Sequence, residues 1–218
     1  CLDSLRQLTY PGPISLIVCD NASGDDSVAQ ILNWAQQHYT TSEIGVLKPE
    51  KEDISSVTPP FILLQTGANL GFAGGNNVGI RYALARQRFE YLWLLNNDTT
   101  VDSQALSILC KCAAAQPQIA LFGSTILEYY QRDRVQCAGG CHYFPLLTIF
   151  RQVFAGLPLN VALQHEEAIK LDYVSGAAMF LRVAAIQQVG ILNEEYFLFY
   201  EELDYTQRLK RQGYEIGW

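Results

Sequence analysis

Residues 91–98 read YLWLLNND, which is five apolar residues of strand length followed at once by two asparagines and an aspartate. A short aliphatic and aromatic run of this kind is typical of a strand buried on both faces. The polar triplet marks the point where the strand leaves the core, and a helix is expected from about Ser103 to Ala115. A strand, a polar turn and a helix therefore form one unit.

The same unit occurs twice upstream. Residues 14–19 (ISLIVC) form an apolar run that ends at Asp20, and residues 61–65 (FILLQ) form a second one. Each run precedes a polar turn and a segment with a helical pattern. The remaining expected elements are helices over about 26–39 and 75–88, the end of an amphipathic helix at 1–9, and a surface insertion at 40–60.

The alternation of apolar strands with helices predicts an α/β fold, in which a mostly parallel sheet is covered by helices on both faces. Ligands bind such sheets beyond the carboxyl ends of the strands. Polar clusters follow the three expected strands at residues 20–25, 66–77 and 96–98. We therefore expect a ligand site at this edge of the sheet.

The composition limits the class of protein. With 218 residues, of which 49% are hydrophobic, the chain is long enough to build one core, and we expect one domain. The formal charge of −7 excludes nucleic acid as a partner but allows a single nucleotide held through a divalent cation. No run of about 20 apolar residues and no signal-like N-terminus is visible, so a soluble, cytoplasmic protein is expected.

The six cysteines lack the paired CxxC spacing of a structural zinc site. Free thiols in a reducing cytoplasm are the expected state. A bridge between Cys137 and Cys141 is the alternative.

Two of the polar clusters carry carboxylates. Asn96, Asn97 and Asp98 offer the oxygen ligands with which a hard divalent cation can be bridged to a diphosphate, although such a triplet can also cap a helix. Asp20 can accept from the imide N–H of a pyrimidine or from ribose hydroxyls, or it can cap the next helix. Position along the chain leaves both choices open.

The third cluster, residues 69–77 (NLGFAGGNN), places three glycines where the backbone approaches something closely. It is not a GxGxxG fingerprint after a first strand, so a dinucleotide-binding dehydrogenase is disfavoured. Further along, YFLFY at 196–200 runs into Glu201, Glu202 and Asp204. Carboxylates crowded beside aromatic rings have raised pKa values, which suits a general base. The alternative is a solvated helix start in which Asp204 pairs with Arg208.

Five segments in order carry a resemblance to a known family: VCDNASGDDS, NLGFAGGNNVGI, WLLNNDTTVD, YVSGAAMFLRVAAIQQVG and YFLFYEELDYTQRLKRQGY. Together they resemble the inverting glycosyltransferases of family 2, with the GT-A fold, and especially the rhamnosyltransferase-like branch. The resemblance covers nearly the whole chain. It implies a single GT-A-like domain over residues 1–218, with a nucleotide-binding half at 1–122 and an acceptor and catalytic half at 123–218.

The resemblance also implies roles for particular residues. Asp98 is the metal-binding acid of a DxD-like motif, in which Asn96 replaces the first acid. The Glu-Asp motif of the family falls on Glu201 and Glu202, so the base is one methylene longer than usual, and which glutamate serves is open. The implied nucleotide contacts are Asp20, Asn21, Asn69, Gly71, Phe72, Gly74, Asn76 and Asn97, the catalytic set is Glu202, Glu201 and Asp204, and the donor and acceptor cleft is lined by Ser175, Gly176, Ala177 and Arg208.

The implied reaction moves a sugar from a nucleoside-diphosphate sugar, dTDP-rhamnose or a UDP-sugar, to a saccharide or lipid-linked acceptor in cell-surface polysaccharide synthesis. The implied cofactor is Mg²⁺ or Mn²⁺. Relative to the family, the first strand and a late metal-binding histidine are missing, and His38, His142 and His165 do not match that histidine. Peripheral association with the inner face of the cell membrane through missing segments is also expected. The rival functions are a non-catalytic nucleotide-sugar-binding module, a sugar nucleotidyltransferase and a protein-interaction role.

Overall fold

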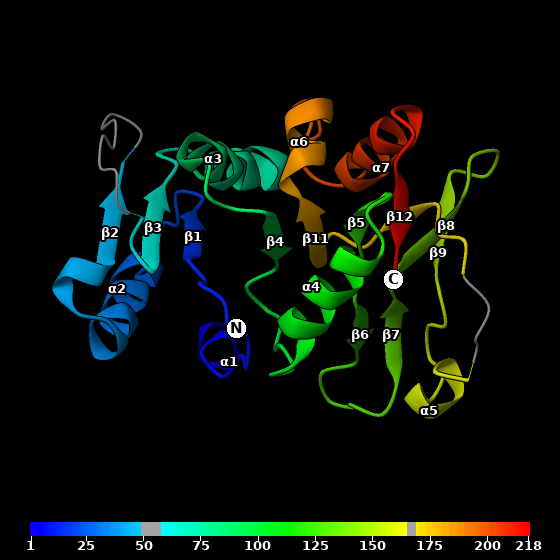
Figure 1. Cartoon of the computed structure of the whole chain (residues 1–218), viewed down its shortest axis with the longest axis horizontal. Coiled ribbons are helices and arrows are strands. Elements are labelled where there is room, and N and C mark those ends of the chain that lie inside the picture. Colours follow the sequence, from blue (N-terminus) through cyan, green and yellow to red (C-terminus); the bar gives the residue numbers. More distant parts are fainter. Residues whose placement is uncertain (49–57, 165–168) are drawn as a thin grey trace. The chain divides into compact units, whose positions relative to one another are not determined.

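The computed structural model describes residues 1–48, 58–164 and 169–218, and these form two compact units. We name each unit after the central strand of its main sheet (Figure 1). The β3 unit contains residues 11–89 and 191–201 and is built on β3 (Phe61–Gln65). The β11 unit contains residues 1–10, 90–190 and 202–218 and is built on β11 (Ala178–Arg182).

The sheet of the β3 unit is fully parallel, in the order β1-β3-β2, with β1 at Leu16–Asp20 and β2 at Ile44–Leu47. The expected strand at 61–65 is confirmed residue for residue. Its first four residues are buried because β3 has a neighbouring strand on each side and helices above and below. The parallel sheet predicted from the apolar runs is present in this unit.

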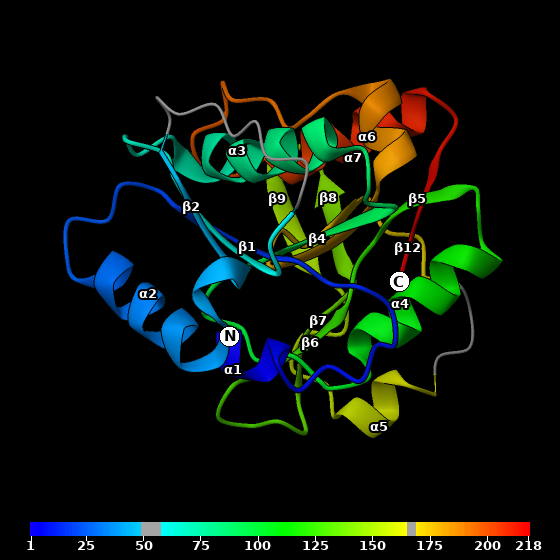
Figure 2. The ribbon, with the colours of Figure 1, turned by 60° about the vertical axis from the view of Figure 1, so that its left-hand side comes forward.

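Helices α2 (Ser27–His38) and α3 (Gly71–Arg86) cover opposite faces of this sheet (Figure 2). The ring of Trp34 on α2 lies 5.9 Å from that of Phe61. On the other face, a Cβ atom at Gly79 of α3 would lie only 2.8 Å from Sγ of Cys19. Phe61 and Cys19 point to opposite faces in the register of β1 and β3, so the two helices sandwich the sheet.

The main sheet of the β11 unit is mixed, in the order β12-β5-β11-β4. Strand β11 runs antiparallel to both β4 and β5, and only β12 and β5 are parallel. The expectation of a mostly parallel sheet therefore does not extend to this unit. The reason is that β11 enters between two parallel strands from the opposite end, after a long excursion through smaller strands. The other strands of this sheet are β4 (Tyr91–Leu95), β5 (Ile119–Phe122) and β12 (Glu215–Gly217).

The rest of the β11 unit surrounds this sheet. There are two small antiparallel sheets: one pairs β6 with β7, and the other has the strand order β10-β8-β9. Helix α4 packs Leu109 and Ala113 against Ile119, Phe122 and Phe180 in the core. The bounds of these elements are β6 (Thr125–Leu127), β7 (Val135–Ala138), β8 (Gly140–Phe144), β9 (Ile149–Gln152), β10 (Tyr173–Val174), α1 (Leu2–Leu5), α4 (Ala105–Ala115), α5 (Leu159–Ala162), α6 (Val183–Val189) and α7 (Glu201–Arg211).

Several sequence-based boundaries differ from the structure. The expected surface insertion at 40–60 contains a 3-10 turn (Thr41–Glu43) and strand β2, so that expectation is wrong for residues 41–47. Strand β2 is only four residues long and its burial is partial, which explains why its pattern is weak. Residues 49–57 of the insertion lie outside the described residues. The third helix begins at Gly71 rather than Gly75, because its first N–H groups find partners in neighbouring amide and carbonyl oxygens.

All six cysteines are free thiols, so the alternative bridge between Cys137 and Cys141 is absent. The Cys137 thiol instead donates to the carbonyl oxygen of Gly140, at 3.1 Å. Among the helices that the structure describes, none is both long enough and apolar enough to cross a membrane.

Candidate functional site

Asp20 ends β1 and is 6% exposed. One carboxylate oxygen, Oδ1, accepts the N–H of Ser23 at 3.2 Å, while the carbonyl oxygen accepts the N–H of Thr66 at 3.0 Å. The first residue of α2, Ser27, donates its N–H to Oδ1 of Asp25 at 3.0 Å, and the N-cap residue, Asp26, makes no side-chain cap bond. Asp20 therefore does not cap this helix, and it shapes the turn that leaves β1.

Asn21 connects that turn to the start of α3. Its Nδ2 donates to Oδ1 of Asn69 and to the carbonyl oxygen of Gly71, both at 3.0 Å. Its Oδ1 accepts the N–H of Leu70 at 2.9 Å, and Oδ1 of Asn69 accepts the Gly71 N–H at 3.1 Å. The two asparagines thus hold the backbone after β3 in place, and their direct contact with a nucleotide stays a prediction.

The glycines of this segment are needed for close packing inside the β3 unit. Gly71 has φ +69°, and a Cβ atom there would overlap the carbonyl oxygen of Phe197. A Cβ atom at Gly74 would lie 2.6 Å from Cβ of Leu70. The close approach expected from the sequence is confirmed, and the neighbour is the protein's own chain.

Two further predicted nucleotide contacts lie in the first turns of α3. The Phe72 N–H donates to the carbonyl oxygen of Phe197 at 2.8 Å, and Nδ2 of Asn76 donates to the carbonyl oxygen of Phe72 at 2.9 Å. The first of these bonds satisfies a helix N–H that lacks a partner within the helix. Residues 191–201 are therefore held against the start of α3.

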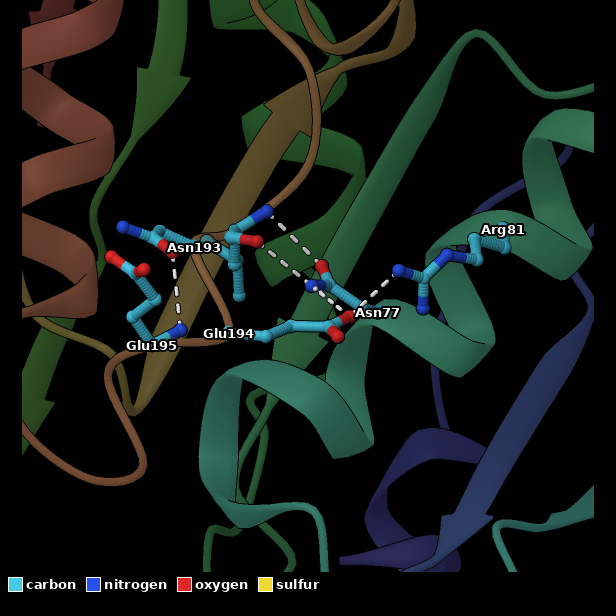
Figure 3. A network of polar contacts seen from close by, with 6 residues as sticks. Asn77, Arg81, Asn193, Glu194 and Glu195 are labelled. Atoms are coloured by element: carbon cyan, nitrogen blue, oxygen red, sulfur yellow. Dashed lines mark hydrogen bonds and ion pairs between the residues drawn. The ribbon is translucent and has the colours of Figure 1, made fainter.

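Asn77 anchors the same segment and was not predicted as a site residue (Figure 3). Its side chain is fully buried. Nδ2 donates to the Leu192 carbonyl oxygen at 2.8 Å and to Oε1 of Glu194 at 2.9 Å, and Oδ1 accepts the Leu192 N–H at 3.0 Å. Arg81 donates to the same Glu194 oxygen at 2.7 Å. The Asn77 amide and then Arg81 lower the pKa of Glu194 below its usual value.

The aromatic run at 196–200 follows this anchor and is exposed. Phe197 and Phe199 are 57% and 68% exposed. Phe199 and Tyr200 have φ values of 72° and 71°, which are uncommon for bulky residues and store strain in the backbone. Anchored, strained and exposed backbone of this kind is found at ligand sites more often than in ordinary turns.

The two glutamates that begin α7 have different environments. Glu201 is 2% exposed, and its Oε2 has no hydrogen-bond partner among the residues that the structure describes. Burial raises the pKa of Glu201. Glu202 is partly buried and lies directly against Gly176, since a Cβ atom at position 176 would be 3.0 Å from its carboxyl carbon. Two residues with predicted roles, Gly176 and Glu202, are therefore neighbours within the β11 unit.

A group of polar side chains near Glu202 was not predicted. Burial raises the pKa of the Tyr173 hydroxyl, and the nearby Cys141 thiol and the Glu202 charge raise it further. The hydrogen bond from Cys137 lowers the pKa of Cys141. Position in the sequence offers no signal for this cluster, because the β8–β10 pairing that brings Cys141 beside Tyr173 is specified only by the fold.

Asp204 and Arg208 form the ion pair that was the alternative to a catalytic role. Nε of Arg208 lies 2.8 Å from Oδ2 of Asp204, and its Nη1 donates to the Val189 carbonyl oxygen at 3.3 Å. The guanidinium also lies over the ring of Tyr205, 4.9 Å from its centre. The pair therefore supports helix α7, and a direct role of either residue in catalysis stays a prediction.

The turn after β4 lies next to the turn before β11. The Asn96 N–H donates to the Ala177 carbonyl oxygen at 3.1 Å, and the Asn96 carbonyl oxygen accepts from Thr99 Oγ1 at 2.8 Å. Asn97 and Asp98 are exposed in this turn. The N-cap residue of α4 is Gln104, which makes no side-chain cap bond and donates its own N–H to Oδ1 of Asp102 at 2.8 Å, so Asp98 is not the helix cap.

The oxygen atoms of Asp98 and its neighbouring asparagines suit Mg²⁺ or Mn²⁺. Within residues 1–48, 58–164 and 169–218, no group of three or more His, Cys, Asp or Glu side chains is arranged to hold a metal ion. His142 lies 3.8 Å from Asp172, the ring of His38 packs on Trp34 at 4.8 Å, and His165 lies outside the described residues. A cation at Asp98 would therefore take most of its ligands from diphosphate and water, as Mg²⁺ commonly does.

The predicted residues thus fall into two groups. Asp20, Asn21 and the segment 69–76 are connected to one another within the β3 unit. The turns at 96–98 and 175–177, together with Glu202, are connected within the β11 unit. Ser175 contributes its N–H to the Gly139 carbonyl oxygen at 3.2 Å, which holds the second of these turns in place.

Comparisons with known proteins bear on the family and the fold. The family model described as "Glycosyltransferase like family 2" matches residues 1–217. The low-salt glycan biosynthesis hexosyltransferase Agl10 of Haloferax volcanii is 27% identical over 154 residues, which cover 71% of this chain and 48% of that protein.

Solved structures share the fold at lower identity. The mannosyltransferase PcManGT from Pyrobaculum calidifontis, in complex with GDP-Man and Mn²⁺, has a TM-score of 0.61 at 16% identity and covers 99% of this chain and 48% of its own. GalNAc-T7 with UDP, GalNAc and Mn²⁺ has a TM-score of 0.66 at 8% identity, with coverages of 99% and 38%. These likenesses show the GT-A fold. The chain spans about half the length of Agl10 and PcManGT.

Proposed function

This chain belongs to the glycosyltransferase-like family 2, and on that premise we propose that it carries out metal-dependent, inverting transfer of a sugar. The donor in this proposal is a nucleoside-diphosphate sugar, dTDP-rhamnose or a UDP-sugar. The acceptor is a saccharide or a lipid-linked saccharide in cell-surface polysaccharide synthesis. Agl10 is named as a hexosyltransferase of glycan biosynthesis, which supports the reaction class but specifies no donor.

The observation that carries the proposal is the connection of two turns and the start of helix α7 within the β11 unit. The Asn96 N–H binds the Ala177 carbonyl oxygen, and Gly176 leaves the space that the carboxylate of Glu202 occupies. An acid for a metal-bound diphosphate, at Asp98, and a carboxylate for the acceptor hydroxyl are thus parts of one connected structure. Inverting transfer needs both kinds of group.

Glu202 is a better candidate for the base than Glu201. Glu201 is buried, its pKa is raised by that burial, and no described residue supplies a partner for its Oε2. An acceptor hydroxyl must come within hydrogen-bond reach of the base, and the partly exposed Glu202 at the Gly176 turn meets this condition more readily.

In the proposed step the acceptor oxygen forms a bond to the anomeric carbon while the bond from that carbon to the diphosphate oxygen breaks. The carboxylate of Glu202 takes the hydroxyl proton, and the configuration at the anomeric carbon inverts. A divalent cation held at Asp98 would neutralise the departing diphosphate. Positioned base catalysis typically contributes ~10²–10⁴ in rate, and electrostatic stabilisation of the leaving group contributes much of the rest.

The proposed nucleotide contacts include Asp20, Asn21 and the segment 69–76 of the β3 unit. Asp20 uses one carboxylate oxygen for the Ser23 N–H, which leaves the other for a pyrimidine imide N–H. One of the solved GT-A structures contains GDP-Man and another contains UDP, so the fold by itself does not determine which nucleobase the donor carries. Competition measurements in which GDP binds better than UDP and dTDP would overturn the pyrimidine assignment.

The test of the function is donor turnover by the full-length protein and its matched glutamate variants. Glu202→Gln should lower the turnover number by ~10² or more and leave nucleotide affinity within a few-fold, because only the chemical step loses its base. Glu201→Gln is the control. Loss of transfer only in the Glu201 variant would assign the base to Glu201. Nucleotide-sugar binding without turnover in the wild type would favour a binding module instead.

A further inference from the structure

The hairpin formed by β8 and β9 exposes an apolar tip within the β11 unit. Residues 143–150 (YFPLLTIF) contain no charged side chain. Leu146 is 99% exposed, and Leu147 is 69% exposed. The other strongly exposed members are Phe144, Ile149 and Phe150. An exposed apolar patch of this kind marks a binding surface for a protein, a membrane or another ligand.

The apolar character surrounds the hairpin rather than covering one face. In the register of β8 and β9, Phe144 is opposite Ile149 and Tyr143 is opposite Phe150. Successive pairs point to opposite faces of a two-stranded ribbon, so both faces are apolar up to the turn. A protein partner would cover one face, whereas a hairpin that is apolar all round is suited to immersion.

The next pair along the hairpin contains one permanently charged side chain. His142 lies opposite Arg151, and Arg151 is exposed. Nδ1 of His142 lies 3.8 Å from Oδ2 of Asp172, so Arg151 is the permanent cation at this level. An apolar tip followed by an arginine matches the order of acyl chains and phosphate groups in a bilayer surface.

The backbone of the turn also suits a shallow apolar environment. The Leu147 N–H donates to the Phe144 carbonyl oxygen at 3.1 Å, and the Thr148 N–H donates to the Pro145 carbonyl oxygen at 3.3 Å. Pro145 has no N–H to satisfy. Unpaired backbone groups are the main cost of placing a turn in lipid, and this turn pairs two of its donors internally.

We propose that the hairpin tip, residues 143–150, inserts into the surface of a bilayer that carries anionic phosphate headgroups, with Arg151 at the level of the phosphates. The inference does not depend on the sugar-transfer reaction, because it rests on the exposure, register and charge of the hairpin alone. The hairpin would be a membrane contact provided by the described residues themselves.

The test is co-sedimentation of the full-length protein with phosphatidylcholine vesicles that contain phosphatidylglycerol, without nucleotide or acceptor. Leu146→Asp combined with Leu147→Asp should lower the apparent affinity ~10-fold or more, because two exposed leucines lose their transfer into lipid. Arg151→Gln should lower it about five-fold on anionic vesicles only, since one arginine near such a surface contributes about that factor. A Leu146→Trp variant should show a blue-shifted emission that brominated lipids quench.

The control is Leu163→Asp, the same type of substitution at a single leucine that is 64% exposed. Leu163 follows α5, which lies at the opposite end of β9 from the tip (Figure 1). Unchanged binding by the Leu146 and Leu147 double variant would overturn the proposal. The proposal would also be overturned if, in sedimentation velocity without lipid, the wild type is a dimer and the double variant is a monomer. The patch would then be an interface between copies of this chain.

Discussion

Gly176→Ala is the perturbation that separates a structural from a functional reason for the glycine beside the predicted base. The added Cβ atom would overlap Oε1 of Glu202, and it would lie 3.0 Å from the carboxyl carbon of that residue and 3.1 Å from its Cγ. Non-bonded atoms prefer separations of ~3.5–4.0 Å, so the end of the Glu202 side chain must move by about 1 Å or more. The atoms that move are the far end of a flexible side chain, and the backbone can stay in place.

The expected result is therefore a large effect on rate and a small one on stability. A misplacement of about 1 Å at a catalytic group can cost ~10² in rate. Relief of the contact by rotation of one side chain should cost about 1 kcal/mol or less, which corresponds to a melting temperature change of ~2–4 °C for a chain of this size. Nucleotide affinity should stay within a few-fold, because the base acts on the acceptor.

The assay is the turnover number for donor and acceptor, measured together with thermal unfolding and with nucleotide binding by calorimetry. Gly24→Ala is the matched control, since a Cβ atom there would meet nothing within 4 Å. A second variant tests the cause. Gly176→Ala combined with Glu202→Asp shortens the displaced side chain by one methylene, so it should recover at least ~10-fold of the lost rate.

Two results would refute this reasoning. If Gly176→Ala turns over as fast as Gly24→Ala, the position of Glu202 does not matter for the chemistry. If the double variant is no faster than Gly176→Ala alone, the loss has another source than the contact with Glu202.

Three further predictions follow from buried or exposed polar groups. Asn77→Leu should lower the free energy of unfolding by ~3–5 kcal/mol in denaturant titrations. The change leaves both backbone groups of Leu192 and one oxygen of Glu194 without their amide partner. A loss of less than about 1 kcal/mol would contradict this. Burial raises the pKa of Glu201 in the folded state, so ionisation of this group opposes folding above its unfolded-state pKa. In thermal scans, Glu201→Gln should therefore be more stable than the wild type at pH 7 but not at about pH 3. Equal stability of the two proteins at both pH values would argue against this. Asp98→Asn should weaken nucleoside-diphosphate binding in Mn²⁺, and calorimetry that finds the same wild-type affinity in Mn²⁺ and in EDTA would remove the metal from the proposal.

The strands whose patterns are strongest are those that the structure reproduces best. Residues 61–65 and 91–95 form strands with the expected bounds, because an unbroken apolar run has few alternatives to burial between neighbours. Strand β2 escaped prediction because its four residues lie in a polar context and are only partly buried. The antiparallel direction of β11 was not predicted either, because the hydrophobic pattern of an apolar strand does not depend on its direction in the sheet.

For the motif residues too, the sequence predicted some features and the structure supplied others. The sequence identified Gly71 and Gly74 as points of close approach, yet only the structure shows that Phe197 and Leu70 are the neighbours. It offered a helix cap as an alternative for Asp98, and the structure places Gln104 at the N-cap of α4 instead. The pairing of Asp204 with Arg208 was within reach of sequence reasoning because both lie on one helix, one turn apart.

By itself the sequence determined the type of most elements, the order of the motifs and the chemistry that the candidate residues can offer. These properties are local, since they depend on composition and spacing within one strand or helix. Only the tertiary structure decided that Gly176 makes room for Glu202 and that Asn77 holds Leu192, a residue 115 positions away. Such contacts depend on strand order, register and the path of the connecting chain, and no local pattern carries that information.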